Sequence, residues 1–147
     1  MDKKEETFMR YGKTFQEKLC QLMIEDRSFC DQMEEVIDLE FFELAYLRAM
    51  TEIVVNYREE RGIHPKYDLL EMKIKGDLEA YDRSVQTQIR EFYARVLASQ
   101  GEISDAGWVK DKAIDFCRKQ VLKKAMMESV GLIKSSSFDE IQKVIQK

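Results

Sequence analysis

The chain has 147 residues, which suits one domain with its own core better than two. Hydrophobic residues make up 44% and charged residues 35%, and no apolar run approaches the roughly 18 residues of a membrane span, so a membrane protein is excluded and no signal peptide is expected. The net charge of -4 is uneven. Residues 1–108 carry 15 Lys and Arg against 23 Asp and Glu, whereas residues 109–147 carry 9 against 5. An acidic body disfavours stand-alone binding to nucleic acid.

The predicted elements are all helical, because one proline and six glycines leave few forced breaks. We expect residues 1–13 to be a flexible N-terminus and residues 14–104 to form a compact head. Thr14 and Glu17 match a capping box, Ser28 and Asp38 are further candidate caps, and Gly62 is a candidate left-handed C-cap. Apolar periodicity then predicts about five helices, over residues 15–25, 29–37, 39–61, 67–75 and 82–98, with a break at residue 76.

The C-terminal part, residues 105–147, is predicted to be an αα-hairpin. Asp105 is expected to cap a long helix that runs to about residue 130, and Ser137 with Glu140 forms a capping box for a returning helix. Two helices alone bury little, so their apolar faces need the head or another molecule. The candidate interface residues are Trp108, Ile114, Cys117, Val121, Ala125, Met126, Phe138, Ile141 and Ile145.

A basic face is expected on the long helix. It consists of Arg118, Lys119, Lys123 and Lys124. Three interpretations stay open for it: a solvated helix face, a contact with an acidic protein partner, and a contact with nucleic acid. Residue types alone do not choose between them.

Catalytic chemistry is not indicated. Gly12, Lys13 and Thr14 match the end of a phosphate-binding loop, but the earlier glycine of that motif is replaced by Thr7 and no buried strand precedes it. The only histidine, His64, lies beside a proline turn and is interpreted as structural. The three cysteines lack metal-ligand spacing and suit buried, reduced thiols. We therefore expect no catalytic, cofactor or metal site in this chain.

Three segments follow one another in a recognisable order, beginning with "FQEKLCQLMIEDRSFCDQMEEVIDLEFFE" and "REERGIHPKYDLLEMKI". Their order resembles the N-terminal domain of DnaB-family replicative DNA helicases, especially phage-encoded members. The first segment is similar to that family's opening helices, and the second to its turn and following helix. "WVKDKAIDFCRKQVLKKAMMESVGLIKSSSFDEIQKVIQK" is similar to its long helix, loop and returning helix. The family's ATPase domain has no counterpart here, so we expect the chain to be a part of a longer protein.

The resemblance implies a non-catalytic assembly domain whose hairpins pair into dimers that build a hexameric ring, and which also binds primase. ATP and Mg would belong to the absent ATPase domain. The acidic body also predicts little direct contact with nucleic acid, and the lack of a long apolar run predicts no membrane contact. Reduced cysteines suit a cytoplasmic location, in a bacterial host if the protein is phage-encoded. Three alternatives stay open: the helicase-binding C-terminal domain of a primase, an unrelated helical interaction module, and a stand-alone helical enzyme or regulator.

Overall fold

The computed structural model describes residues 6–135 and 143–145, and the regular elements of that part are all helical. The predicted all-α class is thereby confirmed. The α-helices are α1 (Gly12–Glu25), α2 (Arg27–Glu34), α3 (Ala45–Arg61), α4 (Tyr67–Asp77), α5 (Arg83–Ala98) and α6 (Ala106–Lys134), and the short 3-10 turns are η2 (Phe8–Tyr11), η3 (Leu39–Phe41) and η4 (Leu78–Ala80).

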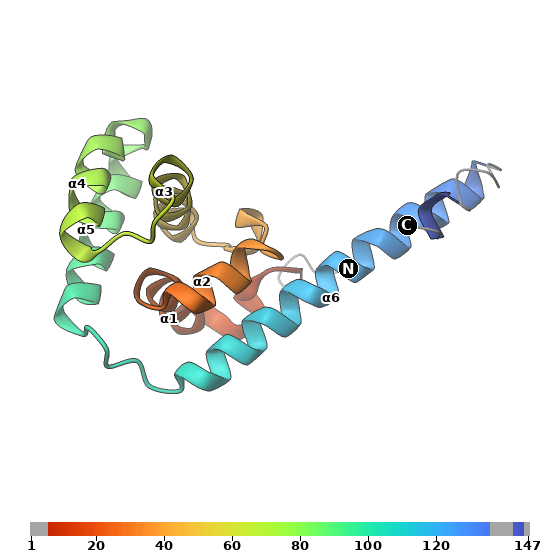
Figure 1. The fold of residues 1–147 in the computed structure, drawn as a ribbon, viewed down its shortest axis with the longest axis horizontal. Helices are drawn as coiled ribbons and strands as arrows, with labels where there is room; N and C mark the ends of the chain where they lie inside the picture. The colour runs from red at the N-terminus through yellow and green to blue at the C-terminus, as the bar shows by residue number, and fades with distance from the viewer. Residues whose placement is uncertain (1–5, 136–142, 146–147) are drawn as a thin grey trace.

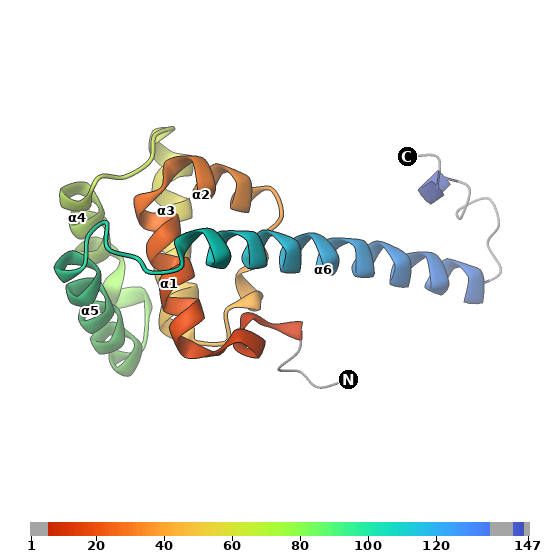
Figure 2. The same cartoon turned by 90° about the horizontal axis from the view of Figure 1, so that it is seen from below.

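The helices form a head from which one long helix projects. In the head, α3 contacts α1 on one side and α4 and α5 on the other, as Figure 1 shows. The first half of α6 packs against α1 and α2, and its second half continues well beyond the head (Figure 2). No helix in the described ranges is both long enough and apolar enough to cross a membrane.

The described part of the N-terminus belongs to the head, contrary to the expected flexible segment 1–13. Phe8 is fully buried, with its ring centroid 5.1 Å from those of both Phe42 and Phe116. Thr7 caps this turn by accepting a 3.2 Å hydrogen bond from the Met9 N–H. Burying a whole aromatic ring outweighs the disordering effect of the neighbouring charges.

Two of the expected helix caps are corrected. Thr14 lies inside α1, which begins at Gly12, and no side chain caps that start. Asp26 and not Ser28 caps α2, because its Oδ1 accepts a 3.0 Å hydrogen bond from the Phe29 N–H. Asp105 does precede α6, but in a left-handed conformation and without a capping hydrogen bond from its side chain. The predicted capping side chains therefore do not set these helix starts.

The helix expected over residues 39–61 is interrupted. The chain forms η3 and a short extended stretch before α3 begins at Ala45. Gln16, which is fully buried on α1, holds this stretch: its Oε1 accepts hydrogen bonds from the N–H groups of Glu43 at 3.0 Å and Leu44 at 3.4 Å. The side chain of a distant helix thus replaces the helical hydrogen bonds that the local pattern predicts.

The remaining boundaries follow the sequence more closely. Gly62 ends α3 with φ of 70°, the left-handed conformation that was predicted. The break expected at Gly76 is absent, since α4 continues to Asp77. Helix α6 likewise continues through Gly131, past its expected end near residue 130. The returning leg of the predicted hairpin lies mostly outside the described residues. Only residues 143–145 of that leg are described, and they are helical.

Candidate association surface on helix α6

The first half of α6 is part of the core. Val109, Ala113, Phe116 and Cys117 are all buried. Lys110 fastens this half to the start of α2 by an ion pair with Asp26, at 2.5 Å. The hydrogen bonds from Lys110 and from the Phe29 N–H both hold the pKa of the Asp26 carboxyl below its usual value. This half of α6 is therefore fixed to the head.

The second half of α6 exposes large apolar side chains. Each retains between 43% and 63% of its accessible surface. A single exposed apolar residue would be ordinary, but several on one helix half require an explanation. The set is Val121, Leu122, Met126, Met127, Val130 and Ile133. By helical rotation Leu122, Met126, Val130 and Ile133 share one side of the helix, whereas Val121 and Met127 lie on other sides. A shared apolar face of this kind marks an association site.

The exposed apolar face points away from the head. Successive residues of an α-helix are rotated by about 100°. Counted from Ala113, which is fully buried, Leu122, Met126 and Ile133 are rotated by about 180–220°. The helix therefore has one apolar face that packs on the head and, further along, a second on the opposite side. The head of the same chain cannot cover the second face without a break in the helix.

The candidate interface residues do not form one surface. Cys117 is fully buried, Ile114 is partly buried against the core, and Trp108 is half-exposed near the start of α6. Val121, Ala125 and Met126 are exposed on the projecting half, and Ile145 is exposed as well. Phe138 and Ile141 lie outside the described residues. The structure thus brings together only the members on the projecting half.

The sequence analysis does not predict Leu122 and Ile133 as interface residues. The predicted row of Ile114, Cys117, Val121 and Ala125 continues from the buried face and does not include the opposite side of the helix. The signal was present in the spacing of Leu122, Met126 and Ile133, which recur at i, i+4 and i+11.

The expected basic face is dispersed around the helix. By helical rotation, Arg118, Lys119, Lys123 and Lys124 spread over more than half of the circumference. Lys119 pairs with Asp115 at 2.9 Å, one turn away on the same helix. Lys123 pairs with Glu6 at 3.2 Å. These residues therefore do not form one basic patch.

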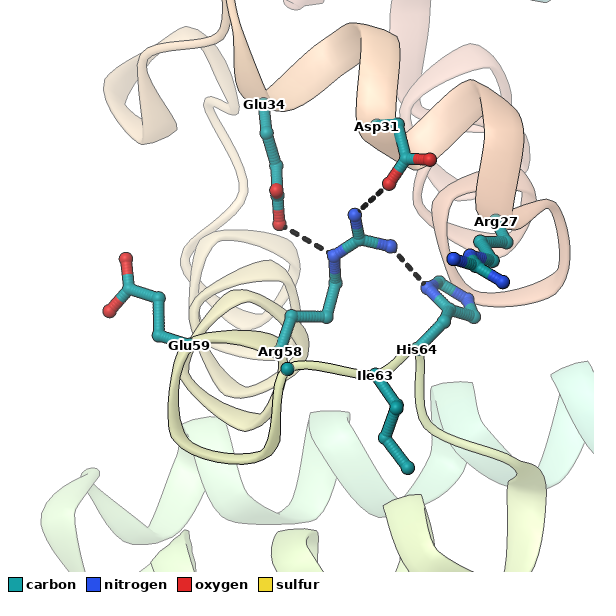
Figure 3. A pocket seen from close by; sticks show the side chains of 8 residues that line it. Arg27, Asp31, Glu34, Arg58, Glu59, Ile63 and His64 are labelled. Atoms are coloured by element: carbon teal, nitrogen blue, oxygen red, sulfur yellow. Dashed lines mark hydrogen bonds and ion pairs between the residues drawn. The ribbon is translucent and has the colours of Figure 1, made fainter.

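A polar hollow of about 170 Å³ lies between α2 and the end of α3, with Arg58 at its centre (Figure 3). Arg58 forms ion pairs with Asp31 and with Glu34, whose carboxylate oxygen lies 2.8 Å from Nε. Its Nη1 donates to the His64 Nδ1 at 2.7 Å. His64 is half-buried and not fully solvated. Arg58 and His64 are hydrogen-bonded to one another, and each also contacts a further group of the protein. The cluster therefore joins α2 to the end of α3 and offers no free nucleophile or base.

Metal and thiol chemistry find little support in the described ranges. There, no group of three or more His, Cys, Asp or Glu side chains converges as metal ligands would. All three cysteines are buried and free, and burial raises the pKa of each thiol to about 12. A thiol with such a pKa is almost entirely protonated at neutral pH and is a poor nucleophile or metal ligand.

No protein-family model matches the chain, and no curated protein or solved structure matches it either.

Proposed function

We propose that this chain is a non-catalytic association domain that binds a second copy of itself through the projecting half of α6. The observation that carries the proposal is the reversal of apolar faces along one helix. The first half is buried on the head, whereas Leu122, Met126 and Ile133 are exposed on the opposite side. An apolar face that its own head cannot cover gains free energy by pairing with an equivalent face.

The resemblance to DnaB-family helicases gives this proposal a specific form. In that form the chain is the N-terminal assembly domain of a hexameric replicative helicase, and paired copies build the ring. Primase is its second partner, and the full-length protein unwinds duplex DNA in the cytoplasm with ATP and Mg bound elsewhere. The order of the three similar segments supports this form, as does a projecting helix with an uncovered apolar face.

Sedimentation velocity over a range of protein concentrations tests the association. The parent chain should sediment as a dimer or larger species at high concentration. A double variant, Leu122→Asp and Met126→Asp, should remain monomeric, because each aspartate would have to be desolvated within the interface. Both positions are about 60% exposed, so the head should keep its fold, which circular dichroism can verify.

Met72→Asp is the matched control, since Met72 is 68% exposed but lies on α4, across the head from α6 (Figure 1). It should associate as the parent does. A parent that stays monomeric at all concentrations would overturn the proposal. The helicase form has its own test, because the reading frame downstream of the codon for Lys147 should encode a phosphate-binding loop.

A further inference from the structure

Helix α6 crosses α1 near the start of α6 (Figure 2). An aromatic pair, Trp108 of α6 and Tyr11 just before α1, makes an edge contact there. Trp108 is 52% exposed, and its ring is held by edge contacts with Phe15 at 5.9 Å and with Tyr11 at 6.2 Å. Phe15 is buried, so this side of Trp108 is anchored to the core. A large apolar ring held rigidly and left half-exposed is the type of group that anchors protein interfaces.

One cation lies over each ring of this pair. The Arg10 guanidinium lies over the Tyr11 ring, 5.3 Å from its centroid, and the Lys112 ammonium lies over the Trp108 ring at 5.9 Å. Lys18, on the same side of α1, donates to the Ser104 Oγ at 2.8 Å just before α6 begins. Within the described ranges, none of these three cations has a carboxylate oxygen within 4.0 Å.

Two carboxylates on the packed helices are already engaged, whereas Asp105, three residues before Trp108, is exposed. Glu17 on α1 pairs with Arg95 at 2.6 Å and accepts a hydrogen bond from the Tyr46 hydroxyl. Asp26 pairs with Lys110, and Asp111 lines the separate groove between α2 and α6. Within the part that the structure describes, Arg10, Lys18 and Lys112 therefore offer cations without an ion-pair partner beside Trp108, in a chain whose net charge is -4.

We propose that Arg10, Tyr11, Trp108 and Lys112 form a docking site for a short acidic peptide segment with an apolar side chain. The apolar side chain packs on the exposed part of Trp108, while carboxylates of the same segment pair with Arg10 and Lys112. This site is independent of the projecting half of α6 and of the association proposed there.

Charge decides between a peptide and nucleic acid as the occupant. A stacked base on Trp108 with phosphates on the two cations would use the same contacts. A nucleic-acid strand, however, brings many charges close to an acidic body, and its affinity depends on a long track of cations. A short segment with a few carboxylates can pair with the three local cations. It is too short to extend over much of the acidic surface, so it is repelled less. The observed charges therefore favour the peptide.

The fluorescence of Trp108 provides a direct test, because it is the only tryptophan in the chain. A short peptide of alternating aspartate and leucine should change its emission in a saturable way at low salt. The double variant Arg10→Gln and Lys112→Gln should bind this peptide about tenfold more weakly, since two exposed ion pairs are lost. Lys75→Gln on α4 removes one exposed charge away from the site and should bind as the parent does.

Two further probes complete the experiment. The same peptide with lysine in place of aspartate, and a single-stranded oligo-dT, should both leave the emission of Trp108 unchanged. No saturable change with the acidic peptide, or equal binding by the lysine peptide, would overturn the site. Stronger binding by oligo-dT would overturn the peptide as occupant. Sedimentation of the Arg10 and Lys112 double variant should match the parent, so this site and the association through α6 can fail separately.

Discussion

His64 donates from Nε2 to the main-chain carbonyl oxygen of Ile24, at 2.6 Å. A carbonyl oxygen can only accept, so the proton must be on Nε2. The other ring nitrogen, Nδ1, then accepts from Arg58 at 2.7 Å. The two contacts select one neutral tautomer and fasten the loop after α3 to the end of α1.

This arrangement predicts that the protein loses stability in mild acid. Burial lowers the pKa of His64, and the Arg58 charge lowers it further, although the bond to Ile24 partly opposes both. The unfolded chain therefore binds a proton more readily, and the free energy of unfolding should fall as the pH drops from about 7.5 through about 6.5 toward the folded pKa. Urea unfolding at several pH values measures the slope.

His64→Gln is the control for that slope, because the chain has no other histidine. The variant should be less stable than the parent at neutral pH, but its free energy of unfolding should change little over the same range. An unchanged slope in the variant would assign the pH dependence to other groups.

Replacement of Arg58 should destabilise the head. Its side chain is only 13% exposed, and it links α2 to the loop that carries His64. Arg58→Met keeps most of the aliphatic stem but loses the bonds to Glu34 and His64, which should cost about 1–2 kcal/mol in urea unfolding. Asp31 is exposed and should contribute little, because water replaces its partner.

Arg61→Met gives the comparison for Arg58. Arg61 is exposed in the last turn of the same helix. Its replacement should change the free energy of unfolding by less than about 0.5 kcal/mol. Equal losses for the two variants would show that the Arg58 cluster is not the cause.

Gln16→Leu should have a larger effect than its modest change in volume suggests. The substitution leaves the N–H groups of Glu43 and Leu44 without their acceptor in the extended stretch before α3. An unsatisfied main-chain donor costs about 1–3 kcal/mol. Gln32→Leu on the exposed face of α2 should cost much less in the same urea titration, and a similar loss for both would contradict the argument.

Gln16 also shows why the sequence predicted some features of the fold and not others. Core positions such as Leu19, Ile53 and Phe92 follow from helical periodicity, and the left-handed Gly62 follows from local conformational preference. The interruption before Ala45 depends on a side chain about 27 residues earlier, so no local pattern reveals it.

The apolar surface on the second half of α6 was also predicted only in part, because its extent depends on residues that are distant in the sequence. Periodicity shows that α6 has apolar positions, but not where the head ends along the helix. Val121 and Met126 were expected at the interface and are exposed, whereas Cys117, on the same predicted row, is buried by the head. The contrast between these residues requires the packing of α6 on α1 and α2, which is set by distant parts of the chain.

Thiol labelling provides an independent measure of the surface on α6. The three native cysteines are buried with pKa values raised to about 12, so the folded parent should react slowly with a maleimide at neutral pH. Met126→Cys adds one thiol at a position that is 60% exposed. Its reaction should slow several-fold as protein concentration rises, because association covers it. Met72→Cys should react at a rate independent of concentration, and the same behaviour at position 126 would mean that this part of α6 stays exposed to water.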